Sequence, residues 1–248
     1  MDAQQLFKAG KLSEAIPALN AHLRDNPSDV RSRTFLFELL CFAGDFDRAE
    51  KQLIIIQEES SKDSMLGALL YRAALAAERT RQSMFETKSF PSRPAAVNGS
   101  APAPISGKLN GKPFKSISDS DPRLGDKLEV FAGGDYLWIS LSDIASIHME
   151  PPKKLRDLIW APAKVVGGPS LRSRELGEIL LPVISPLSWQ HEDDDVRLGR
   201  ATEWCADENG EEAPYGLKML LVDGEEFSFL EIRDLEIESP AHADPAGA

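Results

Sequence analysis

Cysteine, positive charge and long hydrophobic runs are all scarce in this 248-residue sequence. Its two cysteines, Cys41 and Cys205, exclude a disulfide framework and a CxxC metal pair. The net charge of −12 disfavours nucleic acid or an anionic membrane as the main partner, because phosphate binding needs clustered Lys and Arg. No apolar run approaches the ~18 residues that span a bilayer, and no signal-peptide pattern is present. These absences predict a cytoplasmic protein.

Catalytic signatures are missing as well. The sequence contains no GxSxG, Walker A, GxGxxG or HExxH pattern, so a hydrolase, a nucleotide enzyme or a zinc enzyme is poorly supported. The run His191–Asp195 offers nitrogen and oxygen donors, yet its consecutive acids point in different directions and cannot all bind one ion. A solvated charged turn is the better interpretation. We therefore predict no catalytic residue, no cofactor and no metal site.

A short pattern that occurs twice organises the first half of the chain. Residues 9–15 (AGKLSEA) recur 34 residues later as residues 43–49 (AGDFDRA). That spacing is the period of the tetratricopeptide repeat, a helix–turn–helix unit that stacks side by side. Gly10 and Gly44 suit the turn, where glycine adopts a positive φ at little cost. The alternative is two unrelated helical hairpins with similar turns.

The composition changes along the chain and predicts its division into domains. Residues 1–88 are expected to form the helical domain, and residues 89–113, rich in Pro, Ala and Ser, an extended linker. Short alternating strands and turns, including the hairpin signal Gly133–Asp135, predict a β-rich domain over residues 114–238. Residues 239–248 are expected to be disordered. We thus predict an α+β fold, with tetratricopeptide-like helical hairpins followed by a mainly antiparallel β-rich domain.

Helical repeats of this kind usually need about three units for independent stability. The sequence contains two units and one further helix, so we expect the second domain to pack on the helices.

Three polar motifs in the second half have both a functional and a structural interpretation. Asp119–Asp126 is expected to be a turn in which Asp side chains cap backbone amides and Arg123 pairs locally, in preference to a metal or acid/base site. Pro151–Trp160 suits either a binding face or a domain seam with its Trp in the core. Leu198–Trp204 could present a buried Arg–Glu pair, which is more often structural than catalytic.

These motifs, behind a helical repeat, resemble the ImpE/SciE-type proteins, also called TagJ, which are accessory components of bacterial type VI secretion. The resemblance covers nearly the whole chain, and its motif residues are Asp119, Asp121, Arg123, Trp138, Arg156, Asp157, Trp160, Arg200, Glu203 and Trp204. It implies a non-enzymatic adaptor that binds the N-terminal helix of the small sheath subunit, TssB. It also implies a link to the ATPase that disassembles the contracted sheath.

A stack of helical repeats presents a groove into which an amphipathic helix can dock. Mapped by the 34-residue register, the groove positions are Phe7, Arg31, Thr34, Glu38, Cys41 and Arg72. Phe7 and Cys41 are expected to form its apolar floor, and the charged members to set the orientation of the bound helix. The alternative is that these residues face solvent or pack against the second domain.

Two other functions remain open from the sequence. One is a general tetratricopeptide-type scaffold or chaperone for another protein, which the identity of the bound peptide would distinguish. The other is an enzyme, and it requires four groups to converge in one pocket: Asp121, Arg123, Asp157 and Glu203.

Overall fold

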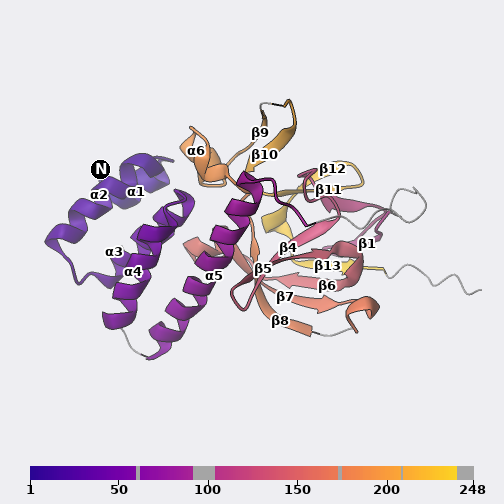
Figure 1. Cartoon of the computed structure of the whole chain (residues 1–248), viewed down its shortest axis with the longest axis horizontal. Coiled ribbons are helices and arrows are strands. Elements are labelled where there is room, and N and C mark those ends of the chain that lie inside the picture. Colours follow the sequence, from indigo (N-terminus) through magenta and orange to yellow (C-terminus); the bar gives the residue numbers. More distant parts are fainter. Residues whose placement is uncertain (60–61, 92–103, 173–174, 208, 239–248) are drawn as a thin grey trace, which may run out of the picture.

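The computed structural model describes residues 1–59, 62–91, 104–172, 175–207 and 209–238. Its first part is a layer of helices, and its second part is a β domain on which the last long helix lies (Figure 1). The five helices of the first part are α1 (Ala3–Lys8), α2 (Leu12–Asp25), α3 (Val30–Phe42), α4 (Phe46–Glu59) and α5 (Lys62–Glu86).

Local signals in the sequence explain where these helices begin and end. The Asp2 carboxylate accepts a hydrogen bond from the backbone of Gln5 at the start of α1, and Asp29 caps α3 in the same way. Gly10 and Gly44 have φ values of +76° and +71°, as the predicted turns require. The helical hairpins α1–α2 and α3–α4 therefore repeat as the 34-residue spacing predicts.

The second part is antiparallel throughout its named strand pairs, which confirms the α+β prediction. Its largest sheet has the strand order β2-β1-β13-β6-β7-β8-β4-β5, beside a three-stranded sheet β12-β11-β3 and a hairpin β10-β9. The strands are β1 (Gly107–Leu109), β2 (Lys112–Phe114), β3 (Ile117–Asp119), β4 (Lys127–Ala132), β5 (Asp135–Ser140), β6 (Ile144–Met149), β7 (Trp160–Gly167), β8 (Glu175–Pro182), β9 (Thr202–Ala206), β10 (Glu212–Gly216), β11 (Met219–Val222), β12 (Glu225–Ser228) and β13 (Asp234–Ile237). A short helix α6 (Asp194–Arg197) precedes β9.

Several boundaries differ from the sequence prediction. Strand β1 and the start of β2 lie inside the range 89–113 that was expected to be a linker, because β1 completes its hydrogen bonds with β13 near the C-terminal end of the domain. Near the end of the domain, the strands β12 and β13 are separated by a short 3-10 helix. The tail 239–248 lies outside the described residues.

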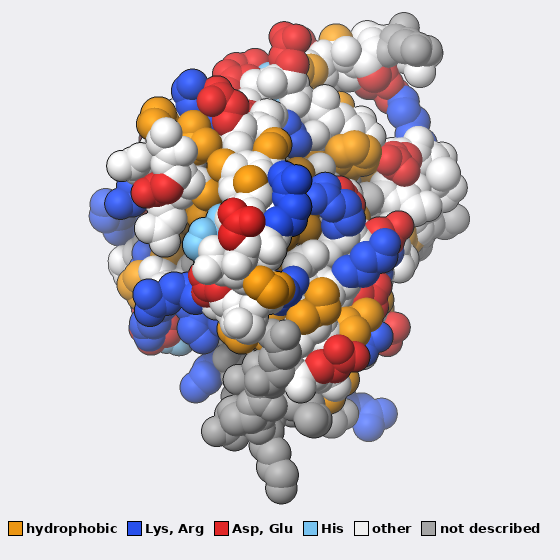
Figure 2. Space-filling view, turned by 90° about the vertical axis from the view of Figure 1, so that its left-hand side faces the viewer, with side chains coloured by type: hydrophobic (Ala, Val, Ile, Leu, Met, Phe, Trp, Pro, Cys, Tyr) orange, Lys and Arg blue, Asp and Glu red, His pale blue; other side chains and the backbone are white. Residues whose placement is uncertain are grey.

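One hydrophobic core joins the helices to the sheet. It combines residues of all five helices with Phe131, Tyr136, Trp160 and Leu180 of the β domain, as expected if the second domain completes the helical stack. A second core fills the space between the large sheet and the three-stranded sheet. On the outer side of the helical layer, hydrophobic side chains are mixed with charged side chains of both signs (Figure 2). No helix in the described part of the chain is long and apolar enough to cross a membrane.

Candidate functional site

A buried ionic cluster connects α5 to the sheet. We call it the seam network, and its members are Glu78, Arg81, Asp119, Glu129 and Lys218. The Arg81 guanidinium donates to both carboxylate oxygens of Glu129, at 2.7 and 3.0 Å. The Lys218 ammonium donates to Glu129 as well and lies 2.8 Å from Asp119. All five residues are at most 4% exposed, so two domains meet through charges that water does not screen.

Aromatic residues extend this network into the core. Tyr136 donates its hydroxyl to Glu129 at 2.6 Å and accepts a hydrogen bond from the indole of Trp138. The indole of Trp160 donates to Glu78 at 2.7 Å. Trp160 is fully buried, which confirms the seam interpretation of the Pro151–Trp160 motif for this residue.

The network holds its two β-domain carboxylates in different electrostatic surroundings. Burial favours the neutral form of Glu129, but the adjacent Arg81 and Lys218 outweigh this effect and hold its pKa well below the ordinary value. Burial raises the pKa of Asp119 to about 6, against the opposing effect of Lys218. Since every charged group is held by another group of the network, we interpret the cluster as a structural connection.

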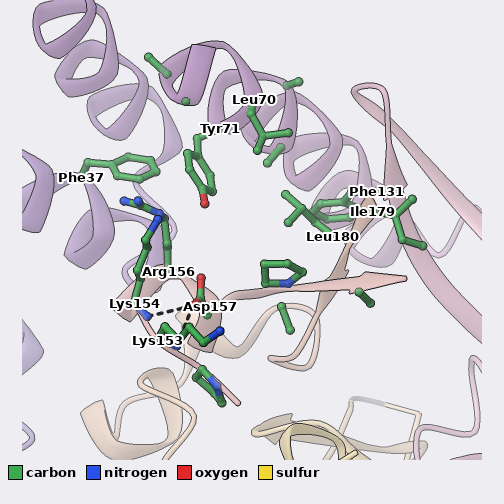
Figure 3. Close-up of a pocket in the computed structure, with 18 of the residues that line it drawn as sticks. Phe37, Leu70, Tyr71, Phe131, Lys153, Lys154, Arg156, Asp157, Ile179 and Leu180 are labelled. Carbon is green, nitrogen blue, oxygen red and sulfur yellow. Dashed lines mark hydrogen bonds between the residues drawn. The ribbon is translucent and has the colours of Figure 1, made fainter. Parts of the chain in front are cut away.

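A cavity of ≈ 920 Å³ lies beside this connection, between the helices α3, α4 and α5 and the strands β7 and β8. We call it the seam cavity. Phe37, Leu70 and Tyr71 come from the helices, and Leu180 faces them from the sheet (Figure 3). The Tyr71 hydroxyl points into the space between these two walls. The cavity therefore has apolar walls from both domains.

One side of the seam cavity is basic. Lys153, Lys154, Arg156 and Lys164 line it together with the acidic residues Glu150 and Asp157. The Asp157 carboxylate accepts hydrogen bonds from the backbone amides of Lys153 and Lys154, each at 2.9 Å, which shapes the turn in front of the cavity (Figure 3). Lys164 lies on β7, and the other residues of this side belong to the segment that links β6 to β7.

Arg156 connects this basic side to the helices. Its guanidinium donates to Glu38 of α3 at 3.3 Å and lies 4.7 Å from the ring centroid of Tyr71. Burial raises the pKa of Glu38, although the positive charge of Arg156 opposes this. Arg156 and Asp157 thus both have structural partners, on the same segment that lines the cavity.

The predicted groove residues do not form one surface. Thr34 lines the seam cavity, and Glu38 meets its basic side through Arg156. Arg31 is exposed, and Arg72 lies 3.3 Å from Glu50 of the neighbouring helix α4. The 34-residue register therefore identified part of the cavity wall and missed its aromatic and sheet-borne residues.

Phe7 and Cys41 lie elsewhere than on the expected groove floor. The Phe7 ring packs edge-to-face on Phe35. The guanidinium carbon of Arg200 lies over the Phe7 ring, 5.0 Å from the ring centroid. Cys41 is 5% exposed and lies at a small gap in the seam beside Trp189, and burial raises the pKa of its thiol. Both residues are covered because the β domain packs on this side of the repeat, which was the stated alternative.

The Asp119–Asp126 motif is a turn, as predicted. Asp119 accepts a hydrogen bond from the backbone amide of Asp121 at 2.9 Å. Asp121 in turn accepts from the backbone amide of Arg123 at 2.9 Å and pairs with its guanidinium at 2.7 Å. Among the residues that the structure describes, no three His, Cys, Asp or Glu side chains are grouped so as to hold a metal ion.

Arg200 and Glu203 do not form the buried pair that was considered for Leu198–Trp204. Arg200 instead donates to the backbone carbonyl oxygens of Phe7 and Lys8, at 2.6 and 3.3 Å, which satisfies the C-terminal end of α1. Glu203 is half exposed and lies 3.4 Å from His191, and Trp204 is 43% exposed. The physical reason is that carbonyl oxygens at the C-terminal end of α1 can accept further hydrogen bonds and lie within reach of the guanidinium.

The four groups named for an enzyme are engaged separately. Asp121 and Arg123 bind each other, Asp157 binds backbone amides, and Glu203 pairs with a histidine. The contacts among the described residues thus give no shared catalytic site.

Sequence reasoning missed a cap that one domain supplies to the other. The Asp194 carboxylate at the start of α6 accepts hydrogen bonds from the backbone amide of Ser13 at 2.7 Å and from its hydroxyl at 2.9 Å. Helix α2 has no cap from its own N-cap residue, Lys11. The acidic run His191–Asp195 therefore serves the N-terminus of a helix in the other domain.

We expect Asp194→Ala to lower the free energy of unfolding by about 1 kcal/mol, because two donors of α2 lose their acceptor. Urea denaturation at neutral pH measures this change. Asp194→Asn keeps one acceptor oxygen and should lose less. Equal losses for the two variants would mean that the charge, and not the cap, carries the effect.

The seam network was also missed, although the sequence holds a signal for it. Glu129 stands between the apolar residues Leu128 and Val130 of β4, and Glu78 and Arg81 are one turn apart on α5. A charge in an apolar strand predicts a buried partner, but the pattern does not say which residue supplies it.

The fold and its seam define a class of protein in which tetratricopeptide-type hairpins are completed by an antiparallel β domain. Comparison with known families gives the same result: a model described as ImpE protein matches residues 111–236, and a tetratricopeptide-repeat model matches residues 6–77. The chain belongs to the ImpE family.

Similar proteins are known at the level of both sequence and structure. The type VI secretion system accessory component TagJ of Pseudomonas aeruginosa is 32% identical to this chain over an alignment 268 residues long. The alignment covers 96% of this chain and 92% of that protein. A crystal structure of a protein from Vibrio parahaemolyticus matches with a TM-score of 0.80 and 22% identity, over 96% of this chain and 98% of that one. This second likeness concerns the fold alone.

Proposed function

We propose that this protein is a non-enzymatic accessory component of a bacterial type VI secretion system and that it acts by binding another protein. The ImpE family membership and the likeness to an accessory component along nearly the whole chain support this role. The separate engagement of the four candidate catalytic groups also favours a binding function over an enzymatic one.

We further propose that the partner is the N-terminal helix of the small sheath subunit, TssB, and that it binds in the seam cavity. The observation that carries this proposal is the cavity itself, whose apolar walls suit the apolar face of an amphipathic helix. Its volume of ≈ 920 Å³ would hold about two turns of an α-helix roughly 10 Å across. Leu70 is 51% exposed at this cavity, so a large apolar side chain is available there for a partner.

Titration of the full chain with a synthetic peptide of that sheath helix tests the proposal. We expect Leu70→Glu to weaken binding by about tenfold or more, equal to ~1.4 kcal/mol, because a charge would face the apolar side of the peptide. Ile54→Glu is the matched control, since Ile54 is also an exposed apolar residue on a helix but is not among the residues that line the cavity.

The outcomes separate the candidate functions. Binding that Leu70→Glu weakens and Ile54→Glu leaves unchanged supports the sheath-helix proposal, provided that a scrambled peptide does not bind. Equal weakening by both variants would place the peptide elsewhere. Absence of binding to the sheath peptide would favour the general scaffold or chaperone, with a different partner.

A further inference from the structure

The basic side of the seam cavity contrasts with the rest of the molecule. The chain has a net charge of −12, yet the described lining of the cavity has four Lys or Arg side chains and two carboxylates. The cavity is therefore a local region of positive charge on an acidic protein. Such a region attracts a partner of the opposite sign and repels one of its own.

The four cations are not equivalent. Arg156 is occupied by Glu38 and Tyr71, and Lys153 lies 3.5 Å from Glu150. Lys154 and Lys164 are exposed at the cavity, and Lys154 makes no ion pair with another described residue. Lys154 and Lys164 are thus the two ammonium groups best placed to meet a ligand.

Both lysines are held on structured backbone. Lys164 lies in the middle of β7, between β6 and β8, where its backbone has partners on both sides. The Lys154 amide donates to Asp157, which fixes the turn in front of η3 (Leu155–Leu158). Their positions relative to the apolar walls are therefore set before any partner arrives.

We propose that the seam cavity selects a helix that carries Asp or Glu side chains along one flank of its apolar face, with Lys154 and Lys164 as the residues that recognise this flank. The apolar side chains would fill the space between Leu70 and Leu180, and the carboxylates would lie toward the strand β7. This inference rests on the proposed function and adds the chemistry by which the cavity distinguishes one amphipathic helix from another.

A cycle of protein and peptide variants tests the inference. The probes are the N-terminal sheath peptide and a second peptide in which its Asp and Glu residues are replaced by Asn and Gln. The protein variant is Lys154→Gln/Lys164→Gln in the full chain. The control is Lys108→Gln/Lys112→Gln, which removes the same charge from two exposed lysines on β1 and β2, outside the cavity lining.

We expect the cavity variant to bind the natural peptide about fivefold to tenfold more weakly at low salt, as two exposed charge pairs would give. The neutral peptide should bind the wild type and the cavity variant with equal affinity, and the control should match the wild type with both peptides. The difference in affinity for the natural peptide between the wild type and the cavity variant should shrink as the salt concentration is raised.

Two results overturn the inference without touching the proposed function. One is that the natural peptide binds the cavity variant as strongly as the wild type, while its binding still depends on Leu70. The other is an equal loss in the control variant, which would mean that net charge alone is responsible. By contrast, loss of all dependence on Leu70 would overturn the proposed function itself.

Discussion

Replacing Glu129 by Gln should lower the free energy of unfolding by about 3–5 kcal/mol, because the change leaves buried positive charge without its central partner. Arg81 and Lys218 are each 2% exposed and both donate to this carboxylate. Gln has nearly the same shape but no charge, and its amide group offers two donors where the network needs acceptors. Denaturant unfolding of the full chain measures the loss.

The stabilisation that Glu129 gives the folded protein should decrease as the pH falls. Its pKa in the folded protein is held well below the ordinary value of 4.5 by Arg81 and Lys218. A lowered pKa means that the folded state favours the ionised form, so this stabilisation is full above pH 4.5 and is lost as the pH falls. The difference in stability between the wild type and Glu129→Gln should therefore shrink below pH 4.5.

A surface carboxylate provides the control. Glu50 pairs with Arg72 and Arg79 on the helical surface, and its side chain is 28% exposed. Glu50→Gln should cost at most about 1 kcal/mol, since exposed pairs contribute little. If Glu129→Gln cost no more than this control, the seam network would not hold the two domains together.

Gly44→Ala should lower the free energy of unfolding by about 2–5 kcal/mol, which is more than the backbone conformation of the turn alone explains. Its φ of +71° disfavours any residue with a Cβ, by about 1–2 kcal/mol. A Cβ at this position would also lie 2.5 Å from two ring atoms of Trp189, so the tryptophan must move. Overpacking of this kind adds about 1–3 kcal/mol.

Gly111→Ala separates these two contributions. Gly111 has a φ of +79° but would place its Cβ in open space. This variant should show the backbone cost alone, about 1–2 kcal/mol in the same denaturation assay. Equal losses for Gly111→Ala and Gly44→Ala would show that Trp189 yields without cost, contrary to the packing described above.

The two turn glycines show which features the sequence predicts and which it does not. The 34-residue repeat predicted Gly10 and Gly44 at turns, because a positive φ is a property of a few consecutive residues. It contained nothing about Asp195 or Trp189, which lie against these glycines in the folded protein. The same limit explains the groove prediction: the register placed Cys41 on a helical face but not the β domain that covers it.

What the sequence determined by itself is the local structure: the helical hairpins with their caps and turns, and the tight hairpin between β4 and β5. These features depend on residues that are close in the chain, so their chemistry can be found from spacing alone. The tertiary structure alone decided the strand order, the connection of Arg81 to Glu129, and the cavity formed between Leu70 and Leu180. The strand order joins segments that are far apart in the chain, and the other two features join side chains from different domains. The energy that selects them comes from burial and charge pairing that exist only after these distant parts have met.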